Sequence, residues 1–181
     1  MTQQGLHREK APQAVIAAII EHACQHALQY GFPSLTLQAV ADSAGVTKSG
    51  LMHHFKTKSQ LLAAVRQRAF DLFSDALEDN MRNDPGGPGT FTRAYIRTCL
   101  ESARDTPDLR LIASLWGMPA LRNEWYEWLQ QQEEMHAATD GSTHCKIARL
   151  AADGAWLAAQ DGTDTREWEQ QLLLMVPAAT S

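Results

Sequence analysis

The 181 residues are enough for one ordinary domain or two small ones and too few for a large multidomain enzyme. Apolar residues make up 44% and charged residues 20% of the chain, so it can form a hydrophobic core and is not disordered throughout. The net charge is −5, yet residues 1–60 carry five basic and three acidic side chains and five of the seven histidines, so we expect only this part to approach a polyanion.

An amphipathic first helix is predicted from Pro12 to Tyr30, because its apolar residues recur at spacings of three and four. Gly31 is suited to a C-terminal cap. Pro33 prevents the helix from resuming at once.

Two short helices follow, separated by Ala44-Gly45-Val46, which is the spacing of a helix-turn-helix. Thr36 is suited to cap the first helix, over residues 37–44, and Thr47 the second, over residues 48–55. Gly45 lies where the backbone must turn with a positive φ, which glycine adopts without a clash of a Cβ atom. The small core between the helices is predicted at Ala41, which must be small where the helices cross, and at Val40, Val46 and Leu51.

The outward side of the second short helix carries side chains that suit duplex DNA. Hydroxyl groups and lysine can hydrogen-bond to purine edges in the major groove. Backbone amides at the helix N-terminus can hold phosphates, and so can Thr36 and Lys58. A plain αα-hairpin with a solvated face is the alternative that this spacing leaves open. The outward residues are Thr47, Lys48, Ser49, His53 and, at the edge, His54.

The rest of the chain is also predicted to be helical, which makes the fold class all-α. A long helix begins at Thr57 or Ser59 and extends to Arg82, and the Pro- and Gly-rich residues 83–89 are the clearest break in the chain. Apolar spacing then predicts a helix from Phe91 to Ala103. Further helices are predicted as short pieces divided by Pro107 and Pro119, and over residues 124–138, 144–159 and 166–176.

The pattern Leu-x-x-His-Phe-x-x-Lys-x-x-Leu-Leu runs from Leu51 to Leu62. This pattern is a signature of the tetracycline-repressor (TetR) family, and residues 10–62 resemble the DNA-binding domain of that family. The chain departs from many members at Met52 and His53, where they carry tyrosines that touch phosphate or bases. Met52 then suits packing, and His53 suits a base or phosphate contact whose strength depends on pH.

The resemblance implies a three-helix DNA-binding domain over residues 1–56 and a ligand-binding and dimerisation domain over residues 57–181, about nine helices in all. It implies a transcriptional regulator, in most members a repressor, that binds a palindromic operator in double-stranded DNA as a homodimer. A small lipophilic and in some cases cationic molecule would release it. The alternative is a non-catalytic ligand-binding protein of the same fold that acts through a protein partner. The DNA contacts implied are Thr36, Gln38, Thr47, Lys48, Ser49, Gly50, His53, His54 and Lys58.

A dimer interface is predicted in the last two helices. Gly154 lies in the middle of a predicted helix, where glycine costs about 1 kcal/mol relative to alanine, so a close approach of a partner helix is a reason for it. Burial against the same subunit is the alternative. The candidate dimerisation residues are Leu150, Ala151, Gly154, Ala155, Ala158, Trp168, Leu172 and Val176.

Aromatic and methionine side chains are concentrated between the long helix and the last two. We interpret them as the walls of a cavity for a flat lipophilic ligand, with ordinary core packing as the alternative. A carboxylate of Glu101, Asp105, Asp108 or Glu124 could attract a cationic ligand. The candidate ligand-binding residues are Phe91, Tyr95, Cys99, Trp116, Met118, Trp125, Trp128 and Met135.

The chain carries no enzymatic or metal-binding motif. GxSxG, Walker A, GxGxxG and HExxH are all absent, so we predict no enzyme and no cofactor. Several potential ligands lie near one another in the sequence, but their spacing matches no established zinc site and we expect no metal. These residues are Glu133, Glu134, His136, His144 and Cys145.

Nothing in the sequence favours a membrane or an oxidising compartment. The longest apolar run, Ala14 to Ile20, is far shorter than the roughly 20 residues that a bilayer crossing needs. Residues 1–10 lack the apolar centre of a signal peptide. Cys24, Cys99 and Cys145 are odd in number and widely spaced, as reduced thiols are. We therefore expect a cytoplasmic protein without membrane contact.

Overall fold

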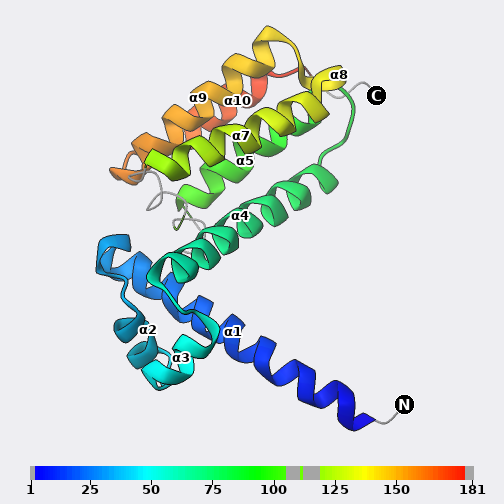
Figure 1. Cartoon of the computed structure of the whole chain (residues 1–181). Helices are drawn as coiled ribbons and strands as arrows, with labels where there is room; N and C mark the ends of the chain where they lie inside the picture. The colour runs from blue at the N-terminus through cyan, green and yellow to red at the C-terminus, as the bar shows by residue number, and fades with distance from the viewer. Residues whose placement is uncertain (1–2, 105–110, 112–118, 178–181) are drawn as a thin grey trace. The chain divides into compact units, whose positions relative to one another are not determined.

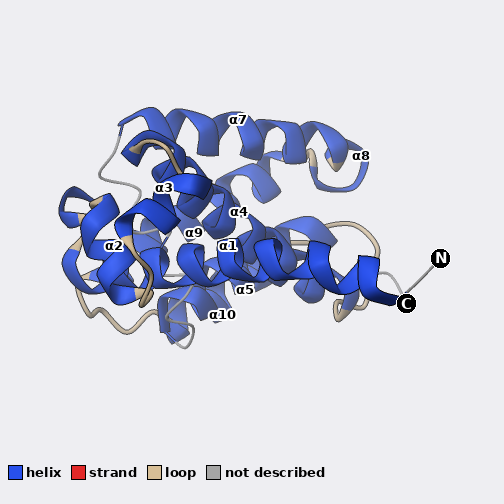
Figure 2. Cartoon of the chain, turned by 60° about the horizontal axis from the view of Figure 1, so that its bottom comes forward, coloured by secondary structure: helices blue, strands red, loops and turns tan. Residues whose placement is uncertain are grey.

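The computed structural model describes residues 3–104, 111 and 119–177, and in these ranges the chain forms nine α-helices, one short 3-10 helix and no strand (Figures 1 and 2). The predicted all-α fold is confirmed. None of the helices in the described ranges has the length and apolar character that a membrane crossing requires. The elements are α1 (Gln3–Tyr30), η1 (Phe32–Ser34), α2 (Leu37–Ser43), α3 (Lys48–His54), α4 (Lys58–Arg82), α5 (Thr90–Arg104), α7 (Pro119–Met135), α8 (Ala137–Asp140), α9 (Thr143–Gln160) and α10 (Arg166–Met175).

The chain divides into two compact units, Met1–Phe70 and Asp71–Ser181. The division falls inside α4, so this helix belongs to both units. The functional boundary predicted from the sequence lies earlier, after residue 56, and it stays a prediction. We call the two parts the N-terminal unit and the C-terminal unit and describe each by itself.

In the N-terminal unit, α1 begins at Gln3, nine residues before the start predicted at Pro12. The prediction placed Pro12 in the first turn, where proline is tolerated. In the structure Pro12 lies inside a helix of 28 residues. The preceding residues are mostly good helix formers, which explains why the helix extends past the one hydrogen bond that proline cannot donate.

The turn between α2 and α3 is a glycine-capped helix end. Gly45 has φ +65°, which is the left-handed conformation that favours glycine. The Val46 amide donates to the Ala41 carbonyl at 3.0 Å, and the Gly45 amide donates to the Asp42 carbonyl at 3.3 Å. This pair of bonds is the Schellman motif, which satisfies the last carbonyls of α2 and reverses the chain. The helix-turn-helix predicted from the spacing is therefore present.

Buried side chains from α1, α2 and α3 form the core of the N-terminal unit. Val40, Ala41 and Leu51 are fully buried, as the sequence predicted, whereas Val46 is only half-buried. The helix α1 contributes Ile19, Ala23 and Ala27.

The start of α4 is fixed by a reciprocal pair of side-chain bonds. Thr57 Oγ1 accepts a hydrogen bond from the Gln60 amide at 3.2 Å, and Gln60 Oε1 accepts one from the Lys56 amide at 2.8 Å. This arrangement is closely related to the capping box. Of the two predicted starts, Thr57 is therefore the one that caps the helix.

In the C-terminal unit, α5 packs most extensively against α9, and α10 packs against both (Figure 1). Phe91, Tyr95 and Leu100 of α5 are fully buried, and so are the small residues Ala148 and Ala152 of α9. The helix predicted over residues 124–138 is instead two helices, α7 and α8, because the backbone leaves the helical region at His136, with φ −100° and ψ 12°. The short helices predicted around Pro107 lie outside the described residues.

Candidate functional site

The helix α3 rests on one buried residue and exposes the opposite face. Leu51 is fully buried, while Lys48, Ser49 and His53 are exposed. Thr47 Oγ1 accepts a hydrogen bond from the Gly50 amide at 3.0 Å and so caps the helix N-terminus. A polar face of this kind at the start of a helix can donate to base edges or phosphates.

Three further predicted contacts lie at the ends of neighbouring helices. Thr36 Oγ1 accepts from the Ala39 amide at 3.1 Å, so its own hydroxyl hydrogen stays available for a phosphate. Gln38 Nε2 donates to Asp42 Oδ1 at 2.8 Å, and Lys58 Nζ donates to the Pro33 carbonyl at 3.3 Å. Both side chains would have to exchange these bonds for contacts with DNA.

Eight of the nine predicted DNA contacts are exposed, and His54 is half-buried. The His54 ring stands edge-to-face against the His53 ring, with centroids 5.3 Å apart. His54 is thus placed to orient His53. The exposed residues are Thr36, Gln38, Thr47, Lys48, Ser49, Gly50, His53 and Lys58.

Two histidines of α1 contact the segments that precede and end α2. His22 Nδ1 lies 3.3 Å from the Ser43 hydroxyl at the end of α2. His26 Nε2 lies 3.3 Å from the Ser34 hydroxyl in η1. The spacing of four residues puts both rings on one side of α1. The sequence shows that spacing, but it does not show the two serine partners.

The aromatic residues predicted to line a cavity form a connected cluster in the C-terminal unit. Phe73 of α4 has ring centroids at 5.9 Å from Tyr95, 4.8 Å from Trp125 and 5.7 Å from Trp128. Phe91, Tyr95, Cys99 and Trp125 are buried, and Trp128 is half-buried. Phe73 was missed in the sequence because it lies on the long helix, away from the other aromatic residues.

Other parts of the cavity prediction do not hold or lie outside the described residues. Met135 was predicted to line the cavity, but its side chain is 69% exposed, so it does not belong to an enclosed lining. It is the last residue of α7, just before the break at His136. Among the candidate carboxylates, Glu101 accepts a bond from Asn80 Nδ2 at 3.3 Å. Trp116, Met118, Asp105 and Asp108 lie outside the described residues.

One face of α9 and α10 is apolar and exposed. Leu150 is 68% and Leu174 87% exposed, and Ala151, Gly154 and Trp168 are also exposed. Ala158 is half-buried. The sequence analysis missed four exposed apolar members of this face, because a helical stripe does not show which of its sides is covered: Ile147, Leu157, Leu174 and Met175.

Three residues assigned to the dimer interface are core residues of the protomer. Ala155, Leu172 and Val176 are all buried within the single chain. They lie on the inner sides of α9 and α10, in the core of the C-terminal unit, where α10 packs against α5 and α9. For these three positions the alternative, burial against the same subunit, is correct.

The described residues contain no group of three or more His, Cys, Asp and Glu side chains that could hold a metal ion. Several of the residues considered above as potential zinc ligands have other contacts or are buried. Glu133 Oε1 accepts from Arg149 Nη2 at 2.7 Å, and the His136 ring stacks on Phe91 with centroids 4.7 Å apart. Cys145 is buried.

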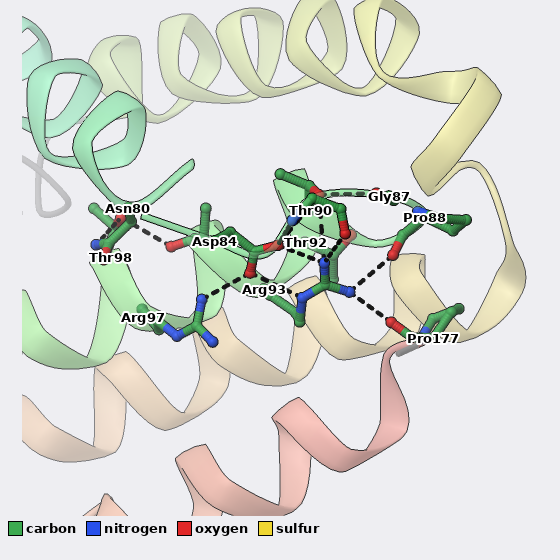
Figure 3. Close-up of polar contacts among 12 residues, drawn as sticks. Asn80, Asp84, Gly87, Pro88, Thr90, Thr92, Arg93, Arg97, Thr98 and Pro177 are labelled. Carbon is green, nitrogen blue, oxygen red and sulfur yellow. Dashed lines mark hydrogen bonds and ion pairs between the residues drawn. The ribbon is translucent and has the colours of Figure 1, made fainter. Parts of the chain in front are cut away.

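A buried ionic cluster ties the end of α4 to the end of α10 (Figure 3). Arg93 donates to the buried Asp84 carboxylate from Nη2 at 2.5 Å and from Nε at 2.9 Å, and Arg97 donates to it at 3.0 Å. Arg93 Nη1 also donates to the carbonyls of Pro88 at 2.8 Å and Pro177 at 2.5 Å. The loop after α4, the start of α5 and the residues after α10 are therefore joined. We call this group the Asp84–Arg93 cluster.

The cluster leaves no room for a side chain at Gly89. A Cβ atom there would lie 2.5 Å from Val176 Cγ1 and 2.8 Å from Arg93 Nη1, and φ is +83°. Burial raises the pKa of Asp84, but the hydrogen bonds from Arg93 and Arg97 lower it more, so the pKa lies well below its ordinary value. The same pairing raises the pKa of Arg93. Asp84 therefore stays charged through the neutral range.

Two family profiles match the chain, one at each end. The profile described as "Bacterial regulatory proteins, tetR family" matches residues 19–65. The profile described as "Tetracyclin repressor-like, C-terminal domain" matches residues 89–175.

The sequence is similar to that of the HTH-type transcriptional regulator RutR of Escherichia coli. It is 33% identical over 120 residues, which are 65% of this chain and 56% of RutR. The match therefore spans little more than half the length of that relative.

Solved structures share the fold at lower sequence identity. The multidrug binding protein EbrR complexed with malachite green has a TM-score of 0.69 and 22% identity over 90% of this chain and 98% of that chain. A TetR-family transcriptional regulator from Streptomyces coelicolor has a TM-score of 0.73 and 18% identity over 97% of this chain and 92% of that one.

The Asp84–Arg93 cluster predicts the stability of an Asp84→Asn variant. Because removal of one partner leaves a buried arginine without its counter-charge, we expect the free energy of unfolding at pH 7 to fall by about 3 kcal/mol. Urea denaturation followed by circular dichroism measures this. The matched control is Arg97→Gln, whose side chain is 28% exposed, and its expected loss is about 1 kcal/mol or less.

The effect of Asp84→Asn is also expected to depend on pH. A carboxyl group with a lowered pKa contributes stability above its ordinary value of 3.8, and this stability is lost as the pH falls toward the lowered value. The difference between wild type and Asp84→Asn should therefore shrink in acid. Equal stability of the two proteins at pH 7 would contradict this account of the cluster.

Proposed function

The chain belongs to the tetracycline-repressor family of transcriptional regulators, and from this premise we propose that it is a homodimeric repressor that leaves its operator when a small lipophilic molecule binds. Residues 1–56 would bind DNA, and residues 57–181 would bind the small molecule and the second subunit. Such a regulator acts where the chromosome is, so we place it in the cytoplasm.

The single observation that carries the proposal is the exposed polar face of α3. Lys48, Ser49 and His53 are exposed on a helix that Thr47 caps and that Leu51 anchors in the core. The N-terminal part of a recognition helix meets base edges in the major groove, where lysine and hydroxyl groups bind purines. Thr36 and Lys58, on either side, are suited to phosphate contacts that fix the register.

The exposed apolar face of α9 and α10 supports a dimer. Monomers rarely expose a contiguous apolar face, and here the exposed residues follow both helices. At Gly154 a Cβ atom would meet nothing within 4 Å in the protomer, so packing within the chain does not require glycine there. A partner helix in close approach would explain it. Twofold symmetry would then present two copies of α3 to two half-sites.

A small molecule would act by shifting a population of conformations. Since α4 belongs to both compact units, a change in its position would move the two recognition helices away from the half-site spacing. The ligand must bind the DNA-incompetent arrangement more tightly, because equal affinity for both shifts nothing. The related fold of EbrR, solved with malachite green and with ethidium, supports a flat lipophilic effector.

Substitution of Lys48 tests the DNA interface. We expect Lys48→Ala to weaken binding to the DNA upstream of the gene by about fivefold to 150-fold, since a base-edge contact is worth about 1–3 kcal/mol. Electrophoretic mobility shifts at low salt measure this. The matched control is Lys146→Ala, which removes an exposed lysine of α9. Equal losses in the two variants, or no binding by the wild type at low salt, would contradict the proposed interface.

Substitutions on the exposed face of α9 and α10 test the dimer. A Leu150→Glu, Leu174→Glu double variant should be monomeric, because four carboxylates would be buried in the symmetric interface. Sedimentation velocity measures the mass. Met135→Glu is the control, since Met135 is also exposed but lies at the end of α7. The interface would be misassigned if the double variant stayed dimeric, or if the wild type were monomeric at the same concentration.

A further inference from the structure

The helix α3 carries one large apolar side chain on its exposed surface. Met52 is 42% exposed, whereas Leu51, the other large apolar residue of α3, is fully buried. The interpretation of Met52 as a packing residue, made from the sequence, is therefore wrong for the protomer. A single exposed methionine needs no explanation in itself, so its meaning depends on the face of the helix where it lies.

Met52 lies on the same side of α3 as two of the proposed DNA contacts. It follows Lys48 by four residues and Ser49 by three, and residues at these spacings are neighbours on a helix surface. Both neighbours are exposed, and so is His53, the next residue along the chain. An orientation of α3 that presents Lys48 and Ser49 to a major groove therefore brings the Met52 side chain to the same groove.

The major groove offers an apolar side chain one group to recognise. The base edges present hydrogen-bond donors and acceptors there, and thymine alone adds a C5-methyl group. A methionine side chain has no donor, and its sulfur is only a weak acceptor, so it is poorly suited to the polar edges. Its unbranched and flexible chain adapts to apolar partners. Contact with the methyl group would remove apolar surface of both from water, which favours binding.

We propose that Met52 is a specificity residue that recognises the C5-methyl group of a thymine in each half-site of the operator. The inference rests on the proposed function, since it specifies one base that α3 reads. Lys48 and Ser49 bind polar groups beside this thymine, and Met52 excludes water from its methyl group.

The position of Met52 on α3 also limits where this thymine lies. The distance along the helix axis from Lys48 to Met52 is about 6 Å, which is close to two base-pair steps. We therefore expect the thymine within about two base pairs of the base that Lys48 contacts.

Replacement of thymine by deoxyuridine tests the proposal, because it removes the methyl group and keeps every hydrogen-bonding atom of the base. Symmetry-related thymines of the two half-sites, located by footprinting, are replaced one pair at a time. Fluorescence anisotropy measures the affinity of the full-length protein for each duplex. We expect one pair whose replacement weakens wild-type binding by about fifteenfold, or about fourfold for one half-site, as the burial of one methyl group per subunit predicts.

Met52→Gln removes the apolar end of the side chain and keeps its length. Glutamine has a helix propensity close to that of methionine, so α3 should stay folded, and circular dichroism checks this. We expect Met52→Gln to bind the thymine duplex and the deoxyuridine duplex equally well. The matched control is Met135→Gln, which alters an exposed methionine of the C-terminal unit and should keep the wild-type ratio. Lys48→Ala should weaken binding to both duplexes by the same factor.

The possible results separate this inference from the proposed function. Equal wild-type affinity for the unmodified duplex and for every deoxyuridine duplex would overturn the inference and leave the proposed function intact, since the protein would still bind its operator. The inference would also fail if Met52→Gln kept the wild-type preference, because another residue or the shape of the DNA would then sense the methyl group. Failure of the wild type to bind the unmodified duplex would overturn both.

Discussion

The left-handed turn at Gly45 is the constraint on which the DNA-binding half of the molecule depends. Its φ of +65° lets the Schellman bonds close between Val46 and Ala41, so α3 leaves α2 at a fixed angle. Leu51 is buried in the core, and the opposite side of α3 is exposed to solvent. An exposed surface of lysine, serine and histidine therefore follows from one glycine and one leucine, with Thr47 satisfying the helix N-terminus.

The C-terminal unit is organised by buried polar contacts between distant segments. The Asp84–Arg93 cluster joins the loop after α4 to the residues after α10. Arg149 joins α9 to α7 through Glu133, and its guanidinium carbon also lies 5.3 Å from the centre of the Phe91 ring. These contacts leave one apolar side of α9 and α10 uncovered in the protomer. The proposed role of this face in dimerisation would cover it with the second subunit.

The local features of the fold were predictable from the sequence. Thr36, Thr47 and Gly45 act on residues within five positions of themselves, so their caps and turn can be inferred without the tertiary structure. The outward side of α3 follows in the same way once Leu51 is recognised as apolar. Pro12 was misread because a helix of 28 residues can absorb one missing hydrogen bond. The break at His136 has no local signal such as proline or glycine.

The features that were not predictable depend on contacts between distant residues. Ala155 and Gly154 are neighbours on one helix, and only the packing of α5 and α10 decides that the first is buried and the second exposed. The hydrogen bond from the Tyr95 hydroxyl to Asp153 joins two residues that are 58 positions apart. Likewise, Arg93 and Pro177 are 84 residues apart. Sequence periodicity identifies an apolar stripe, but the burial of each side requires the arrangement of the helices.

Hydroxyl-radical footprinting of the full-length protein on the DNA upstream of its gene tests the central claim most directly. A dimer that places two copies of α3 in successive major grooves should protect two stretches about 34–36 Å, or one helical turn, apart, related by an inverted repeat. Protection of both stretches at the same protein concentration is the predicted result. A single protected stretch, or uniform protection without an inverted repeat, would contradict the account.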